Sequence, residues 1–218
     1  MDLFKYFLDN DNKPDHKPKS QSTKEIKRVD SANIDSKVIT DKHVKLISKW
    51  INWSDVDAGR FTLLFYRIDV KYEFKLLFRG SRDGFTCEKL RELCDNQTRT
   101  VTIIKVKGGD EILGGYNPVA WNPGYRDLYY MYTKESFIFS FNDKSNVENC
   151  ILSRVKDNGF AIRDGVTVSP SFGKTDLFIN KDILTKGKCK KDTYEKAIRK
   201  AKDNFVIEEY EVFQVIQR

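Results

Sequence analysis

Residues 74–85 read FKLLFRGSRDGF, and this stretch decides how the middle of the chain folds. Its first half is apolar and aromatic, a composition that favours a β-strand. Gly80 and Gly84 then end the strand, because glycine adopts positive φ angles that strain other residues. Thr86 follows as a candidate helix N-cap, with Glu88 in the first helical turn, where its charge favours the helix dipole. The stretch therefore predicts a strand, a tight loop and a capped helix in succession.

The chain beyond this stretch is rich in strand and turn signals. Residues 101–106 and 111–116 are typical of a hairpin around a turn at residues 107–110 that contains two glycines. Gly114 and Gly115 lie inside the second strand, which predicts a bulge or the close approach of another backbone. Further strands are predicted over residues 61–68, 72–78, 136–141 (with three Phe on one face), 151–155, 159–162, 176–179 and 210–216.

Helical periodicity is confined to three short segments. The first follows Thr40, where Val44, Ile47 and Ile51 repeat at helical spacing. The second is the capped helix after the loop, and the third is predicted over residues 193–201. Because strands and helices do not alternate regularly, a doubly wound parallel sheet is excluded. The pattern predicts an α+β fold in which two antiparallel β-sheets pack as a sandwich flanked by short helices.

The first 35 residues differ in composition from the rest. Residues 3–8 form a short apolar helix or turn, and residues 9–28 are almost wholly polar. Such a polar segment cannot bury enough surface to offset the entropy lost on ordering, so it is predicted to be a flexible linker. We therefore divide the chain into an N-terminal helix with linker, residues 1–35, and a folded domain, residues 36–218. The opening helix is then a docking segment or the end of a longer element.

Composition points to a soluble protein of the cytoplasm. No apolar run approaches the about 20 residues needed to span a bilayer, and the N-terminus carries early charge without a cleavable signal site. The four cysteines form no Cys-x-x-Cys pair and are expected to be reduced thiols.

The net charge is +7, and residues 181–202 hold nine Lys/Arg against three Asp/Glu. This basic segment can attract phosphates or an acidic protein surface, but it lacks nucleic-acid motifs and is interpreted as a solvated face.

Catalytic signatures are sparse. Of the two histidines, His16 lies in the predicted linker and His43 is expected to be a surface or packing residue. No phosphate-binding glycine loop and no metal-ligand cluster is found in the sequence, so neither a cofactor nor a metal is expected. Ser81, Arg82 and Asp83 form the one constellation that an enzyme could use. We interpret these three side chains as groups that hold the loop, since Asp and Ser satisfy turn amides and Arg pairs with carboxylate.

The aromatic stretch at residues 121–132 has the composition of a protein interface, because Tyr, Trp and Arg dominate interface energetics. The candidate partner-contact residues are Trp121, Tyr125, Arg126, Tyr129 and Tyr130. The alternative is that this loop folds back and caps the sandwich. Composition alone favours neither.

Several segments, in order, resemble one family. They are residues 74–85, 100–107, 111–116, 136–141, 172–173, 176–177 and 209–213. Together they resemble the TLDc domain, over about residues 36–216. Within this pattern, Arg79, Gly80, Ser81, Arg82, Asp83, Gly84, Gly114 and Gly115 are the signature positions, and we interpret them as structural.

The resemblance implies a compact two-sheet sandwich and a non-enzymatic module that binds a protein partner. Members of the family include oxidation-resistance proteins, and several bind the vacuolar proton-pumping ATPase and regulate its assembly. Many fungal members carry the domain after BTB and BACK domains, joined by a short helix and a polar linker that residues 1–37 resemble. No BTB domain is present in this sequence. An adaptor fragment of a BTB-type ubiquitin-ligase receptor is therefore one alternative function, and an enzyme that uses the loop at residues 81–83 is another.

Overall fold

The computed structural model describes residues 34–53, 72–122, 124, 127–143, 146–165, 169–182, 184–201 and 204–218. The chain divides into two compact units, residues 1–32 and 33–218, and all the described residues belong to the second. The helix predicted at residues 3–8 and the strand predicted at residues 61–68 lie outside the described residues.

The strands are β1 (Tyr72–Arg79), β2 (Thr100–Val106), β3 (Ile112–Asn117), β4 (Tyr129–Met131), β5 (Phe137–Phe141), β6 (Cys150–Arg154), β7 (Ile162–Asp164), β8 (Ser171–Phe172), β9 (Phe178–Ile179), β10 (Lys186–Lys188) and β11 (Asn204–Gln217). The helices are α1 (Asp41–Trp53), α2 (Gly80–Asp83), α3 (Cys87–Cys94) and the 3-10 turn η1 (Asn158–Phe160). Most predicted elements are thereby confirmed, including the strand, loop and capped helix at residues 72–94.

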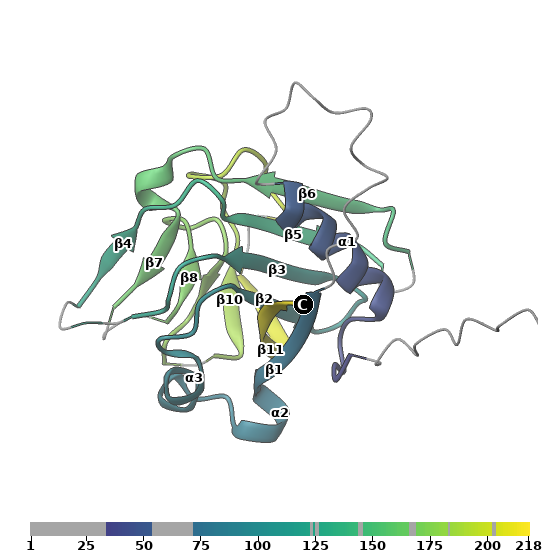
Figure 1. Cartoon of the computed structure of the whole chain (residues 1–218), viewed down its shortest axis with the longest axis horizontal. Coiled ribbons are helices and arrows are strands. Elements are labelled where there is room, and N and C mark those ends of the chain that lie inside the picture. Colours follow the sequence, from purple (N-terminus) through teal and green to yellow (C-terminus); the bar gives the residue numbers. More distant parts are fainter. Residues whose placement is uncertain are drawn as a thin grey trace, which may run out of the picture. The chain divides into compact units, whose positions relative to one another are not determined.

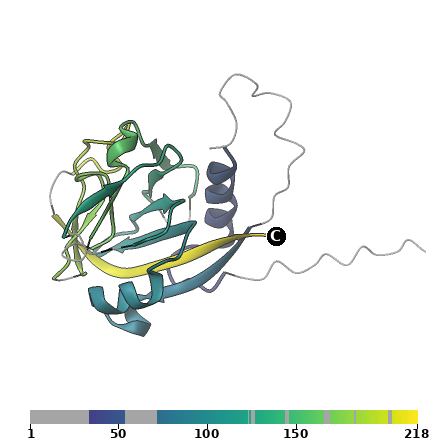
Figure 2. The ribbon, with the colours of Figure 1, turned by 60° about the vertical axis from the view of Figure 1, so that its left-hand side comes forward.

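Two antiparallel sheets form the domain, as the sequence predicts (Figure 1). The larger has eight strands in the order β6-β5-β3-β2-β11-β10-β9, with β1 paired to β11, and the smaller has the order β4-β7-β8. The long strand β11 joins the parts of the larger sheet, because it pairs with β2 along one edge and with β10 and then β1 along the other. Figure 2 shows β11, in yellow, curving across the domain beside β1.

Apolar side chains pack on both faces of the larger sheet, in two separate clusters. Helix α1 covers one face, where Trp50 lies 5.5 Å from the ring of Phe139 and 5.8 Å from that of Phe141. His43 is fully buried there and meets Phe141 edge-on at 4.6 Å, so it is a packing residue. The other cluster includes residues of α3 and of the smaller sheet. Among the described residues, no helix is long and apolar enough to cross a bilayer.

The two glycines of β3 are needed because of aromatic rings, not because of a bulge. Strand β3 keeps an unbroken register with both β2 and β5, so the predicted bulge is wrong. A Cβ atom on Gly114 would run into the ring of Phe139 and lie 2.5 Å from the carbonyl oxygen of Thr102. One on Gly115 would lie 2.6 Å from the ring of Phe172. The predicted close approach of another backbone is thus seen at Gly114, and an aromatic ring fills the space beside each of the two glycines.

Two predicted elements take another form. Residues 159–162 contain the end of η1 and the start of β7, not a single strand. Residues 193–201 form bends, and the predicted helix is wrong. The amides that would start this helix are bound elsewhere: the backbone N–H groups at residues 192–194 donate to the carboxylate of Asp176, and that of Lys196 donates to Ser153 Oγ at 2.7 Å. The carbonyl oxygen of Thr193, which in a helix would accept from the N–H of Ala197, accepts instead from the N–H groups of Lys156 and Asp157 at 3.0 and 3.1 Å.

Candidate functional site

The loop at Gly80–Gly84 is one helical turn closed by hydrogen bonds of its own. The N–H of Gly84, with φ of 93°, donates to the carbonyl of Gly80 at 2.9 Å. The carboxylate of Asp83 accepts from the backbone N–H of Arg79 at 2.9 Å and from the guanidinium of Arg82 at 2.8 Å. The hydrogen bond from Arg82 holds the pKa of Asp83 below its usual range. Asp83 is therefore an ionised group that closes the turn.

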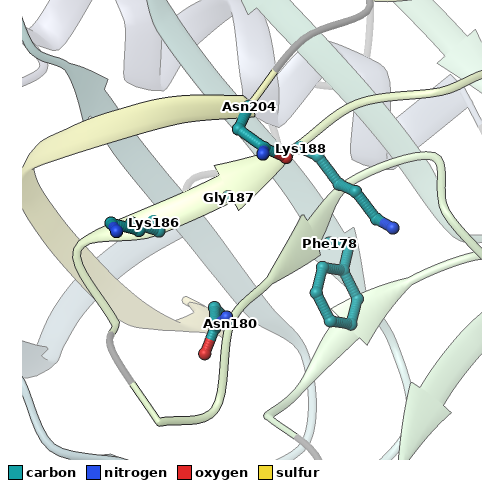
Figure 3. Close-up of a pocket in the computed structure, with 6 residues that line it drawn as sticks. All are labelled: Phe178, Asn180, Lys186, Gly187, Lys188 and Asn204. Carbon is teal, nitrogen blue, oxygen red and sulfur yellow. The ribbon is translucent and has the colours of Figure 1, made fainter.

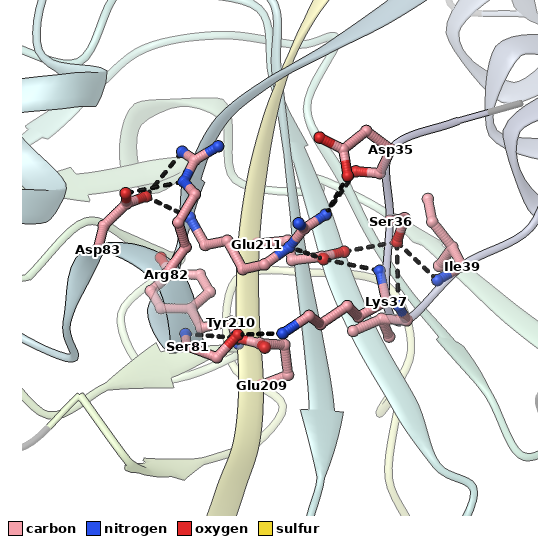
Figure 4. Close-up of polar contacts among 12 residues, drawn as sticks. Asp35, Ser36, Lys37, Ile39, Ser81, Arg82, Asp83, Glu209, Tyr210 and Glu211 are labelled. Carbon is pink, nitrogen blue, oxygen red and sulfur yellow. Dashed lines mark hydrogen bonds and ion pairs between the residues drawn. The ribbon is translucent and has the colours of Figure 1, made fainter. Parts of the chain in front are cut away.

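A buried ion pair fastens this turn to β11 (Figure 4). Nε of Arg79 donates to the carboxylate of Glu211 at 2.7 Å, and the two side chains are 9% and 0% exposed. The other oxygen of Glu211 accepts from the Ser36 hydroxyl at 2.5 Å, and the N–H of Lys37 donates to the first oxygen at 2.9 Å. Arg79 also binds Asp35 at 2.8 Å. One carboxylate thus holds the end of β1 and the segment before α1 against β11.

Ser81 is held in the same network. Its backbone N–H donates to the carboxylate of Glu209 at 3.0 Å, and its hydroxyl accepts from Nζ of Lys37 at 2.9 Å. In this contact the lysine is the donor and the serine hydroxyl is the acceptor. Among the residues that the structure describes, no three His, Cys, Asp or Glu side chains gather as a metal site.

The candidate contact residues of the aromatic stretch are placed differently from one another. Trp121 is only 2% exposed, its Nε1 donates to Thr100 Oγ1 at 2.7 Å, and its ring meets Phe172 edge-on at 6.0 Å. A side chain so enclosed cannot be a surface anchor, so the interpretation of Trp121 as a contact residue needs correction: it is a core residue. Tyr125 and Arg126 lie outside the described residues.

Tyr129 and Tyr130 lie on β4, which is the outer strand of the smaller sheet. Both side chains are half-buried, and the ring of Tyr130 meets Phe160 edge-on at 5.0 Å. Two exposed apolar side chains flank the strand: Leu128 is 43% exposed and Tyr132 is 69% exposed. We call residues 128–132 the β4 edge surface. It presents apolar groups beside a strand that, in the described part of the chain, pairs only with β7.

The buried carboxylate of Asp164, on β7, lies next to the β4 edge surface. Asp164 lies opposite Tyr129 in the sheet register and is fully buried. Its oxygens accept from Arg91 of α3 at 2.6 Å and from the backbone N–H of Asn122 at 2.9 Å. Asn122 is therefore tied to β7, and β7 is tied to α3. Burial also raises the pKa of the Tyr129 phenol.

The family model of the TLDc domain matches residues 32–216, which is nearly all of the chain. The chain belongs to the TLDc domain family. All seven segments that resemble the family lie inside this match. A comparison with curated proteins found no match. In this TLDc domain the signature turn is held by Glu209 and Glu211 from the last strand, so two signature segments far apart in sequence meet in space.

Sequence reasoning did not single out Leu128 or Tyr132 as contact residues of the TLDc domain. It chose Trp121 because large aromatic residues dominate interfaces, and that rule does not tell a core tryptophan from a surface one. The signal that marks Leu128 and Tyr132 is their position on either side of an edge strand. That position depends on which strands pair, and the local sequence does not contain this information.

The cysteines of this TLDc domain are free thiols, as expected. Burial raises the pKa of Cys94 and of Cys189 to about 12, and it also raises the pKa of Cys87 and Cys150. Cys150 is half-buried, and the other three are buried. Since the thiolate is the nucleophile, none of these sites resembles an activated cysteine.

Brief treatment of the native domain with iodoacetamide at about pH 8 should modify Cys150 first and leave the other three thiols intact. A thiol with a pKa of about 12 holds very little thiolate at that pH, and burial also blocks the reagent. Peptide mass mapping before and after denaturation in urea measures the order of labelling. Rapid labelling of Cys87, Cys94 or Cys189 in the folded protein would contradict this prediction.

Proposed function

We propose that this TLDc domain is a non-enzymatic protein-interaction domain whose β4 edge surface contacts the partner. The observation that carries the proposal is the exposure of Leu128 and Tyr132, 43% and 69%, at the two ends of an outer strand. An outer strand offers backbone N–H and C=O groups that a segment of another protein can pair with. The exposed side chains would then enter pockets or apolar contacts of that partner.

The contacts and burial of the candidate catalytic side chains, Ser81, Asp83 and His43, support a role without catalysis. Ser81 has a lysine as its hydroxyl partner, and Asp83 is bound by Arg82 and by the backbone of Arg79. His43 of α1 is 0% exposed and packs on the ring of Phe141. General acid–base catalysis needs a group that can exchange protons with a substrate, and these contacts leave none of the three in that position.

For the partner, we propose a subunit of the vacuolar proton-pumping ATPase on its cytoplasmic side, with a consequent effect on oxidative-stress resistance. Membership of the TLDc family supports this choice, because several members bind that pump and others are oxidation-resistance proteins. The alternative, an adaptor fragment of a BTB-type ubiquitin-ligase receptor, places the essential contact in the N-terminal segment instead. The two proposals therefore predict different sensitive residues.

Capture of purified vacuolar ATPase by the immobilised full chain tests the proposal. The variant Leu128→Ser with Tyr132→Ser should lose at least about tenfold in apparent affinity, since truncating central apolar contacts costs that much or more. Ile216→Ser is the matched control for Leu128→Ser, because Ile216 is 37% exposed and lies on β11, away from β4. Thermal unfolding of each variant checks that the fold is retained.

Equal capture by the wild type and the double variant would overturn the role of the β4 edge surface. Absence of capture by the wild type would overturn the choice of partner. Deletion of residues 1–30 should leave capture unchanged, and loss of binding in this deletion alone would favour the adaptor alternative.

A further inference from the structure

The strip formed by β9, β10 and the start of β11 has an exposed outer face with a basic recess. The recess has a volume of about 170 Å³. Its lining residues are Phe178, Asn180, Lys186, Gly187, Lys188 and Asn204 (Figure 3). Lys186 and Lys188 are two positions apart on β10, so both side chains belong to the same face of the sheet.

The sheet register explains why these residues line one recess, with Lys186 and Lys188 at its opposite sides (Figure 3). Lys188 lies opposite Phe178 of β9 on one side and opposite Asn204 of β11 on the other. Gly187 faces the interior, where a Cβ atom would lie 2.5 Å from the ring of Phe205. Residues at the start of β11 alternate between exposed and buried, so one face of this strip is in contact with solvent. The recess therefore lies on the solvent-facing side of this strip.

The charge of the recess is not neutralised within the described part of the chain. Neither Lys186 nor Lys188 forms an ion pair there, and the nearby acids in sequence, Asp182 and Glu208, pair with neither lysine. A third cation is close, because the guanidinium carbon of Arg163 lies 4.8 Å from the centre of the Phe178 ring. Anions are therefore attracted to this face.

We propose that this recess binds a carboxylate side chain of an acidic peptide segment from a partner protein. Its volume suits a single side chain, and two lysine ammonium groups with the Asn204 amide provide the hydrogen-bond donors. Nζ of Lys188 lies 5.2 Å from the centre of the Phe178 ring, the only aromatic ring of the lining. Arg163 also lies against this ring, so two cations already contact it. A ring covered in this way is a poor platform for stacking a nucleobase, which favours a peptide over nucleic acid.

This site uses β9, β10 and β11, and the proposed contact with the proton pump uses β4. The two proposals therefore stand or fall separately. The basic segment of the sequence, interpreted above as a solvated face, contains both lysines of the recess. The structure distinguishes these two from the exposed Lys190 and Lys191, which do not line it.

Fluorescence anisotropy with a labelled hexaglutamate peptide and the full chain tests the site at low salt. The variant Lys186→Gln with Lys188→Gln should weaken binding by at least about tenfold, because it removes both ammonium donors. The matched control, Lys190→Gln with Lys191→Gln, removes the same charge from the same segment and should change affinity by less than about twofold. A hexaglutamine peptide should not bind.

Equal losses in the two double variants would show general charge attraction and overturn the site. Absence of hexaglutamate binding by the wild type would overturn it as well. Inorganic phosphate and a single-stranded DNA oligonucleotide serve as competing probes. Binding of either one that depends on Lys186 and Lys188, without binding of the peptide, would replace the proposal with a phosphate or nucleic-acid site.

Discussion

Replacing Glu211 with alanine is expected to lower the free energy of unfolding by about 3–5 kcal/mol. Glu211 is fully buried, and its carboxylate is the partner of the Arg79 guanidinium, which is itself only 9% exposed. Removing Glu211 leaves the largely buried Arg79 charge with Asp35 as its acidic partner, and Asp35 is 71% exposed, so its charge is largely screened by water. The hydroxyl of Ser36 and the N–H of Lys37 lose their acceptor at the same time.

Urea unfolding followed by tryptophan fluorescence measures this loss. Glu73→Ala is the matched control, because Glu73 also lies on a strand and pairs with an arginine, Arg218, but the two side chains are 43% and 63% exposed. An exposed pair contributes about 0–1 kcal/mol, so the control should unfold close to the wild type. Similar stabilities for the two variants would contradict the view that the Arg79–Glu211 pair fastens the signature turn.

The second large effect is expected for Asp176→Ala, which should lower the free energy of unfolding by about 3 kcal/mol. The carboxylate of Asp176 accepts from the backbone N–H groups of Asp192, Thr193 and Tyr194 at 2.8, 2.9 and 3.0 Å, and it is 2% exposed. Each buried donor left without an acceptor costs about 1–3 kcal/mol, and water can replace part of the loss where the chain relaxes. The same urea titration measures the change.

Two further variants show whether the hydrogen bonds of Asp176 cause this effect. Asp176→Asn keeps one acceptor oxygen and should lose less than the alanine variant. Asp110→Ala removes a carboxylate that is 72% exposed and should change stability by less than about 1 kcal/mol. A loss below about 1 kcal/mol in Asp176→Ala would mean that residues 192–194 hold their conformation without this carboxylate.

The segment at residues 193–201 shows where sequence reasoning failed and why. Tyr194 and Ile198 recur at helical spacing, and both are indeed buried. The periodicity agrees with their burial, but the carbonyl oxygen of Thr193, which a helix would pair with Ala197, accepts from the N–H groups of Lys156 and Asp157, more than 35 positions away. Helical propensity is a weak preference, and tertiary contacts of this number override it.

For the candidate site too, some interpretations from the sequence agree with the structure and one does not. Sequence reasoning interpreted the loop at Ser81–Asp83 as structural, and in the structure Asp83 accepts from the backbone N–H of Arg79 while the N–H of Ser81 donates to Glu209. It also selected the stretch that contains the β4 edge surface. It placed Trp121 on the surface, however, because composition cannot report that Thr100 and Phe172 enclose the indole ring.

The sequence by itself determined the parts of this TLDc domain that depend on neighbours along the chain. The strand preference of Tyr72–Arg79 follows from its apolar and aromatic residues, and the turn and the helix capped by Thr86 follow from glycine and from capping contacts within a few residues. Only the tertiary structure decided what depends on distant partners: the Arg79–Glu211 pair, whose members are 132 positions apart, the burial of Trp121 and the exposed edge of β4. The physical reason is that a residue's intrinsic preferences act over one turn or strand, whereas burial and charge compensation are set by whichever segments the fold brings into contact.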